Sequence, residues 1–144
     1  MGGKALPVFK KHKRKEKLYM TLDNFTIKAQ EAVQHAVQLV RRNGQQAIEP
    51  VHLLKGVMEK GKDVATFIFQ KMGINAAHVE TLADSEIQHL PRVQGGEPFL
   101  SRESNDVLMR AMDMSKQMGD EFVSVEPLLL ALLEVNSKIG RAHV

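Results

Sequence analysis

The stretch FTIKAQEAVQHAVQLVRRNGQQAIEPVHLLKGVME, residues 25–59, has a second copy in the same chain. Shifted by 75 positions, it aligns without a gap with LSRESNDVLMRAMDMSKQMGDEFVSVEPLLLALLE, residues 100–134. Similarity at one constant period is the sequence signature of a repeat architecture. We therefore predict two copies of one structural unit. The identical pairs are Ala36/Ala111, Gly44/Gly119, Leu53/Leu128, Leu54/Leu129 and Glu59/Glu134.

Each copy has the pattern of two helices joined by a tight turn. Thr26 and Ser101 are N-cap residues, whose hydroxyls can accept a hydrogen bond from an unpaired backbone N–H group. Gly44 and Gly119 stand where a residue with a left-handed backbone ends a helix. Pro50 suits the first turn of the following helix, where its missing N–H has no intrahelical acceptor. Side chains at helical spacing form one face in each copy: Ala29, Val33, Ala36, Val37 and Val40, and then Leu108, Ala111, Met112 and Ser115.

Two further helices are predicted between the copies. Asp63 can cap a helix over 64–72, and Asn75 can cap a helix over 76–90 that ends at Pro91. The first repeat, about 25–90, is then a four-helix unit, followed by a Gly- and Pro-containing linker over 91–99.

The second repeat, about 100–138, contains only the first two helices of that unit. Aromatic residues make up only 5% of the chain and tryptophan is absent, a composition that favours helix over sheet. We predict an all-α fold in which a four-helix unit is repeated in tandem and the second repeat is truncated, with six helices in total. Without the last two helices, Leu129, Leu132 and Leu133 are expected to lack packing partners and to make the chain associate.

The net charge of +3 comes from the first residues of the chain. Residues 1–19 contain seven lysines and arginines and one acidic residue, Glu16, so the remainder is mildly acidic and would repel phosphates. We interpret 1–19 as a leader that is not native or is disordered, Met20 as the start, and 20–138 as the domain. Residues 139–144, IGRAHV, resemble a translated sequencing adapter.

Several classes of protein are excluded by what the sequence lacks. The absence of cysteine removes disulfide scaffolds, thiol nucleophiles and Cys-based zinc sites, and it fits a cytoplasmic protein. No apolar run approaches the length of a membrane span. The six histidines form no HxxxH or HExxH pair, so we predict no metal site, and no spacing suggests a catalytic constellation.

A family resemblance is carried by the segments IEPVHLL (48–54) and VSVEPLL (123–129). They resemble the motif I/V-x-x-E-H-L-L in the N-terminal domain of the Clp family of AAA+ unfoldases. The chain departs from this motif at Val51, which replaces the acid, and at Pro127, which replaces the histidine. Three segments are most similar to the ClpB branch rather than ClpA or ClpC: NFTIKAQEAVQ (24–34), LPRVQGGEPFLSRESNDVL (90–108) and GDEFVSVE (119–126).

The resemblance implies a substrate-docking module of a protein disaggregase. Such a protein forms a hexamer, uses ATP and Mg²⁺ in ATPase modules that this chain lacks, and threads unfolded or aggregated polypeptides together with DnaK-type chaperones. This chain would then need no cofactor, would not be an enzyme, and would bind neither nucleic acid nor membrane.

The resemblance also implies which residues bind substrate. Thr26, Asp120 and Glu126 match positions that engage substrate around a shallow apolar groove, and Ile27 and Leu108 match its lining. Acids beside an apolar groove would favour apolar segments flanked by Lys or Arg. The residues also have purely structural explanations, because Thr26 is an N-cap and Glu126 stabilises the first turn of a helix.

Three other functions are weighed against this one. The first is an adaptor-docking N-terminal domain of a ClpC- or ClpA-type unfoldase, which shares the repeat. The second is a nucleotide-hydrolysing enzyme, since GVMEKGKD (56–63) fits G-x-x-x-x-G-K but has Asp63 where a Ser or Thr must bind Mg²⁺. The third is nucleic-acid binding through the basic leader.

Among the methionines, we expect Met112 in the core and Met109 at the surface.

Overall fold

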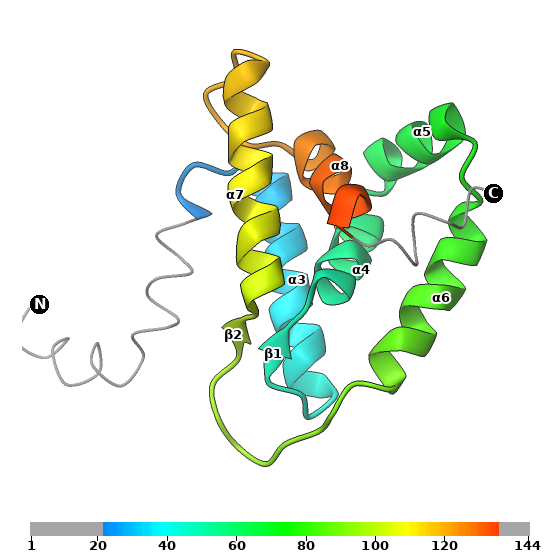
Figure 1. Cartoon of the computed structure of the whole chain (residues 1–144), viewed down its shortest axis with the longest axis vertical. Helices are drawn as coiled ribbons and strands as arrows, with labels where there is room; N and C mark the ends of the chain where they lie inside the picture. The colour runs from blue at the N-terminus through cyan, green and yellow to red at the C-terminus, as the bar shows by residue number, and fades with distance from the viewer. Residues whose placement is uncertain (1–21, 136–144) are drawn as a thin grey trace, which may run out of the picture.

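The computed structural model describes residues 22–135, so the leader 1–19, the start at Met20 and the tail 139–144 lie outside the described residues. The predicted all-α fold is confirmed, with six helices in the described part of the chain (Figure 1). The helices are α3 (Ile27–Arg42), α4 (Pro50–Lys60), α5 (Lys62–Met72), α6 (Ala76–Gln88), α7 (Arg102–Gln117) and α8 (Val125–Val135). Two short strands, β1 (Ala47–Ile48) and β2 (Phe99–Leu100), pair in parallel.

The two copies of the repeat form equivalent helix pairs. Helix α7 begins and ends 75 positions after α3, and α8 begins and ends 75 positions after α4. The copies also exchange equivalent backbone hydrogen bonds: Ser101 N donates to Ile48 O at 3.1 Å, and Thr26 N donates to Val123 O at 2.9 Å. In each case, the N-cap residue of the first helix of one copy donates to a residue that lies two positions before the second helix of the other copy.

The predicted ends of the repeated helices are confirmed. Thr26 Oγ1 accepts a hydrogen bond from Ala29 N at 3.2 Å, and Ser101 Oγ accepts one from Ser104 N at 3.1 Å. Gly44 has a backbone φ of 67°, a value that side chains with a Cβ atom rarely adopt. Pro50 is the first residue of α4.

Two predicted boundaries are wrong. Asp63 does not cap α5, because the chain passes from α4 through the single residue Gly61 into a helix that already begins at Lys62. Asp63 therefore lies in the first turn of α5. Helix α6 is capped by Asn75, whose Oδ1 accepts a bond from His78 N at 3.0 Å, but it ends at Gln88 rather than at residue 90.

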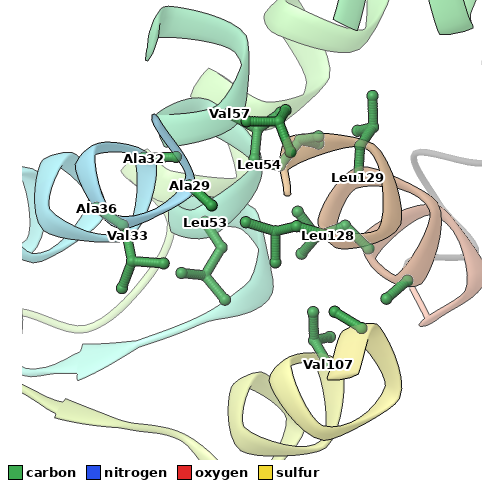
Figure 2. Close-up of a cluster of buried hydrophobic side chains, with 14 of the residues drawn as sticks. Ala29, Ala32, Val33, Ala36, Leu53, Leu54, Val57, Val107, Leu128 and Leu129 are labelled. Atoms are coloured by element: carbon green, nitrogen blue, oxygen red, sulfur yellow. The ribbon is translucent and has the colours of Figure 1, made fainter. Parts of the chain in front are cut away.

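The core lies where the two repeats meet. Figure 2 shows leucines of α4 and α8, the repeat-equivalent pairs Leu53/Leu128 and Leu54/Leu129, gathered between α3 and Val107 of α7. Helices α3 and α4 are in close contact at Gly56, where an added Cβ atom would lie 2.0 Å from the backbone oxygen of Ala32. Small side chains on α3 permit this approach, and they are fully buried: Ala29, Ala32 and Ala36.

The expectation that α8 leaves leucines uncovered is wrong for two of the three residues. Leu129 and Leu132 are buried, and Leu133 is half-buried against the core. Helix α8 contacts α3, α4, α5 and α7, so its apolar side chains have partners on several sides. The first repeat therefore supplies much of the packing for the second.

Candidate functional site

A groove of about 440 Å³ opens where three helices begin. It lies at the first turn of α3, the first half of α5 and the start of α8, and we call it the α3/α5/α8 groove. Helices α5 and α8 contact each other and lie next to each other in Figure 1. Its lining residues are Thr26, Lys28, Asp63, Val64, Phe67, Ile68, Ser124, Val125 and Glu126.

Backbone geometry holds the three walls together. The bond from Thr26 N to Val123 O ties the start of α3 to the segment that enters α8. At Gly61, an added Cβ atom would lie only 2.7 Å from Val125 Cγ1, so the absence of a side chain lets α5 approach α8. The repeat contact and a glycine thus determine the width of the groove.

The floor of the groove is apolar and one aromatic ring is open to solvent. Ile68 and Val125 are almost fully buried and form the base, whereas Phe67 is 59% exposed. Lys71 places its ammonium 5.4 Å from the centroid of the Phe67 ring, a cation–π contact. An exposed phenylalanine in a concave surface is available to contact an apolar ligand.

The lining residues include two carboxylates, Asp63 and Glu126, and one ammonium, Lys28. Asp63 and Glu126 are exposed, and each lies in the first turn of its helix, where the positive end of the helix dipole attracts negative charge. Lys28 forms an exposed ion pair with Glu31 at 3.7 Å. Within residues 22–135, neither Asp63 nor Glu126 has a salt-bridge partner, so both are available to a cationic ligand.

The structure brings together only part of the predicted site. Thr26 and Glu126 both line the groove. Ile27 is 74% exposed next to Thr26 but does not line it, and Asp120 lies exposed in the loop that leads to α8. The prediction that Leu108 lines the groove is wrong, because its side chain is completely buried in the core.

Sequence reasoning missed the wall that α5 provides. Asp63, Val64, Phe67 and Ile68 all line the groove. A signal was present in the sequence. Ile68 and Phe69 lie on one face of the helix, which is the face that the core buries, whereas Phe67 lies off that face and fills no core position. Met109 and Met112 lie as predicted, the first 52% exposed and the second packed against the core.

The segment that nearly matches a phosphate-binding loop has a structural role. Gly56 lies inside α4 against Ala32, and Gly61 joins α4 directly to α5. A phosphate-binding loop requires a strand, a loop that wraps the phosphates and a helix. Here two consecutive helices stand in its place, so the glycines serve helix packing.

We predict that this chain does not bind Mg-ATP. Calorimetric titration should give no saturable heat beyond dilution, because two consecutive helices replace the strand and the loop that would wrap the phosphates; Asp63 also puts negative charge where a magnesium-binding hydroxyl is needed. A control titration of Asp63→Ser should be equally silent, since the helical geometry is unchanged. Saturable heat at micromolar nucleotide would contradict the prediction.

Among the histidines of residues 22–135, the one that is fully buried belongs to a structural network. His52 is fully buried; its Nδ1 accepts from Glu49 N at 2.9 Å, and its Nε2 lies 2.8 Å from Gln45 Oε1. Gln45 Nε2 in turn donates to Ile87 O at 2.7 Å, which links α4 to the end of α6. In the part of the chain from 22 to 135, no group of three or more acidic or histidine side chains could hold a metal ion, and no helix is long and apolar enough to cross a membrane.

Comparisons with known proteins agree on one family. The family model described as "Clp repeat (R) N-terminal domain" matches residues 24–142. The chaperone protein ClpB of Bacteroides thetaiotaomicron is 60% identical over 121 residues, which cover 84% of this chain and 14% of that protein. ClpB of Porphyromonas gingivalis is 53% identical over 114 residues, which cover 79% and 13%. The chain thus spans about one seventh of the length of these curated relatives.

Solved structures show the same fold at lower identity. The Hsp104 N-terminal domain from Candida albicans has a TM-score of 0.72 at 21% identity and covers 83% of this chain and 79% of its own. The N-terminal domain of the ClpV1 ATPase from E. coli has a TM-score of 0.74 at 22% identity and covers 86% and 76%. The family match, the ClpB relatives and the shared fold lead to one conclusion: the chain belongs to the Clp repeat N-terminal domain family, as found in ClpB chaperones.

Proposed function

We propose that the α3/α5/α8 groove binds unfolded polypeptide, weakly and with broad sequence tolerance, as the substrate-engaging module of an ATP-dependent disaggregase. The observation that carries this proposal is the exposed ring of Phe67 within a groove that also contains Thr26 and Glu126. An apolar surface with a few polar groups around it suits a ligand that presents apolar side chains on an extended backbone.

Weak binding follows from the shape of the groove. Its base residues Ile68 and Val125 are already buried, so a ligand gains contact mainly with Phe67 and Val64. An unfolded polypeptide also loses conformational freedom when it is held in place. Both effects favour transient contacts, as required of a module that must release its substrate for threading.

The role of the whole protein belongs to the same proposal. The ClpB relatives are about six times as long as this chain. We propose that the complete protein forms a cytoplasmic hexamer, that its ATPase modules bind ATP and Mg²⁺, and that it works with DnaK-type chaperones on aggregated polypeptides. This chain contributes binding and no catalysis.

Replacing Glu126 with lysine tests the groove directly. We expect a fluorescent peptide of alternating Arg and Leu to bind about 3- to 10-fold more weakly, since an exposed charge contact contributes about 0.2–1 kcal/mol and a reversal adds repulsion. Fluorescence anisotropy measures the affinity, and urea unfolding followed by circular dichroism checks that the domain remains folded.

The matched control is Glu103→Lys. Glu103 is also an exposed acid at the second position of a helix, α7, but it does not line the groove. It should lose the same helix-dipole stabilisation and leave peptide affinity unchanged. Thr26→Ser should keep the N-cap and most of the stability. If the peptide does not bind the unmodified chain, or if both charge reversals weaken it equally, the groove is not the binding site.

A further inference from the structure

The two copies of the repeat meet at two junctions that are equivalent under the 75-residue shift. At the first, which we call the Ile48 junction, Ser101 N donates to Ile48 O at 3.1 Å. At the second, which we call the Val123 junction, Thr26 N donates to Val123 O at 2.9 Å. Thr26 and Ser124 both line the α3/α5/α8 groove, so the Val123 junction joins two of its walls.

A buried hydroxyl group strengthens only the Ile48 junction. Ser104 Oγ donates to Ile48 O at 2.6 Å, so this carbonyl accepts one bond from α7 and one from the N-cap of α7. The residue 75 positions before Ser104 is Ala29, which is fully buried and has no hydroxyl. Among the described residues, Val123 O therefore accepts a bond from Thr26 N alone.

The chain that enters the second helix of each copy is also held unequally. In the first copy, the buried side chain of Gln45 bonds to His52 and to the carbonyl of Ile87. The residues 75 positions after Gln45 and His52 are Asp120, which is exposed, and Pro127, whose ring offers no hydrogen bond. The network that ties down the first copy therefore has no equivalent in the second.

The linker between the repeats covers only the Ile48 junction. Arg41 and Gln46 both donate to Glu97 of the linker, at 3.1 and 3.3 Å. Figure 1 shows the linker at the β1–β2 end of α7, away from the loop between α7 and α8. The covered loop, 43–47, is exposed at a single residue, whereas every residue of its equivalent, 118–122, is exposed. Segments with few buried contacts open at a lower free energy than the rest of a domain.

We propose that the Val123 junction opens locally while the Ile48 junction stays closed, because it lacks the hydrogen bonds that hold its equivalent. This opening moves the α8 wall of the groove away from the α3 wall and gives access to Val125, which is buried at the base. The proposal concerns the walls of the groove and not a ligand, so it stands whether or not the groove binds polypeptide.

Hydrogen exchange followed by NMR tests the inequality of the two junctions. After correction for intrinsic rates, the Thr26 amide should exchange about 10-fold faster than the Ser101 amide. Thr26 exchange should not respond to low concentrations of urea, because a local opening exposes little surface. If both amides exchanged at the same corrected rate with the same urea dependence, both junctions would open only with the whole domain and the proposal would be overturned.

Moving the hydroxyl between the junctions tests the cause. Ala29→Ser supplies the missing donor and should slow Thr26 exchange about 2- to 10-fold, with Ser101 unchanged. Ser104→Ala should accelerate Ser101 exchange by a similar factor, and it tests the cause even if Ala29→Ser does not fold. Ser85→Ala, at an exposed position of α6, is the matched control and should change neither rate. Rates that do not follow the hydroxyl would contradict the proposed cause.

An introduced thiol tests whether the groove itself opens, since the chain contains no cysteine. The thiol of Val125→Cys should react with a thiol reagent when the Val123 junction is open, and adding Ala29→Ser should slow the reaction about 2- to 10-fold. The control is Ala131→Cys, at a fully buried position further along α8, which should react only as the domain unfolds. Equal reaction rates at the two positions would show that no local opening reaches the groove, and the proposal would fail.

Discussion

Replacing Gly56 with alanine is expected to destabilise the domain by about 1–3 kcal/mol, although alanine is the better helix former. Inside a helix, glycine to alanine normally gains about 1 kcal/mol. Here the new methyl group would meet the backbone oxygen of Ala32 at 2.0 Å, and a backbone atom cannot rotate away. Helices α3 and α4 would have to separate, which disturbs the tightly packed face that they share. Urea unfolding measures the loss.

The equivalent position in the second repeat provides the control. Ala131 lies 75 positions after Gly56, in α8, and is fully buried. Ala131→Gly should cost about 1 kcal/mol, the ordinary helix-propensity difference. If Gly56→Ala stabilised the domain as propensity alone predicts, the close contact between α3 and α4 would be wrong.

Lowering the pH from 7 to 5 is expected to reduce the unfolding free energy by about 2 kcal/mol through His52 alone. Burial lowers the pKa of His52 from 6.5 in the unfolded chain to about 4 in the folded one. Between pH 6.5 and pH 4, His52 therefore binds a proton in the unfolded state but stays neutral in the folded state. The stability that neutral His52 provides is present above pH 6.5 and is lost as the pH falls towards 4. The hydrogen bonds agree, because Nδ1 already accepts from Glu49 N and protonation would bring two donors together.

His52→Gln should remove most of this pH dependence while lowering stability at pH 7. A smaller slope of the same sign should remain from His35, since burial also lowers the pKa of that half-buried histidine. Urea unfolding at a series of pH values between 7 and 5 measures each variant. An unchanged slope in His52→Gln would show that His52 does not carry the effect.

The sequence alone was sufficient to predict the helices and their repetition. Their signals are local: the capping hydroxyls of Thr26 and Ser101, the left-handed glycines and the spacing of apolar residues all act within a few turns of chain. Repetition strengthened each signal, because the same pattern occurred twice at one period. The family followed from the motif at 48–54, despite the departure at Val51.

The site was predictable only in part. Thr26 and Glu126 were placed by resemblance and both line the groove, whereas Leu108 was misplaced. A leucine on the apolar face of a helix can line a groove or fill a core, and the choice depends on the partner that packs there. Here α8 and α4 both contact α7, and Leu108 is buried.

Only the tertiary structure decided how the two repeats combine. The strand pair β1–β2 and the bond from Thr26 to Val123 join segments that are far apart in sequence and too short to show an alternating pattern. The same long-range packing gives Gly56 its role and brings α5 beside α8, which forms the groove and exposes Phe67 to it. Local sequence determines which segments become helices, but a groove between helices depends on contacts between residues distant in sequence.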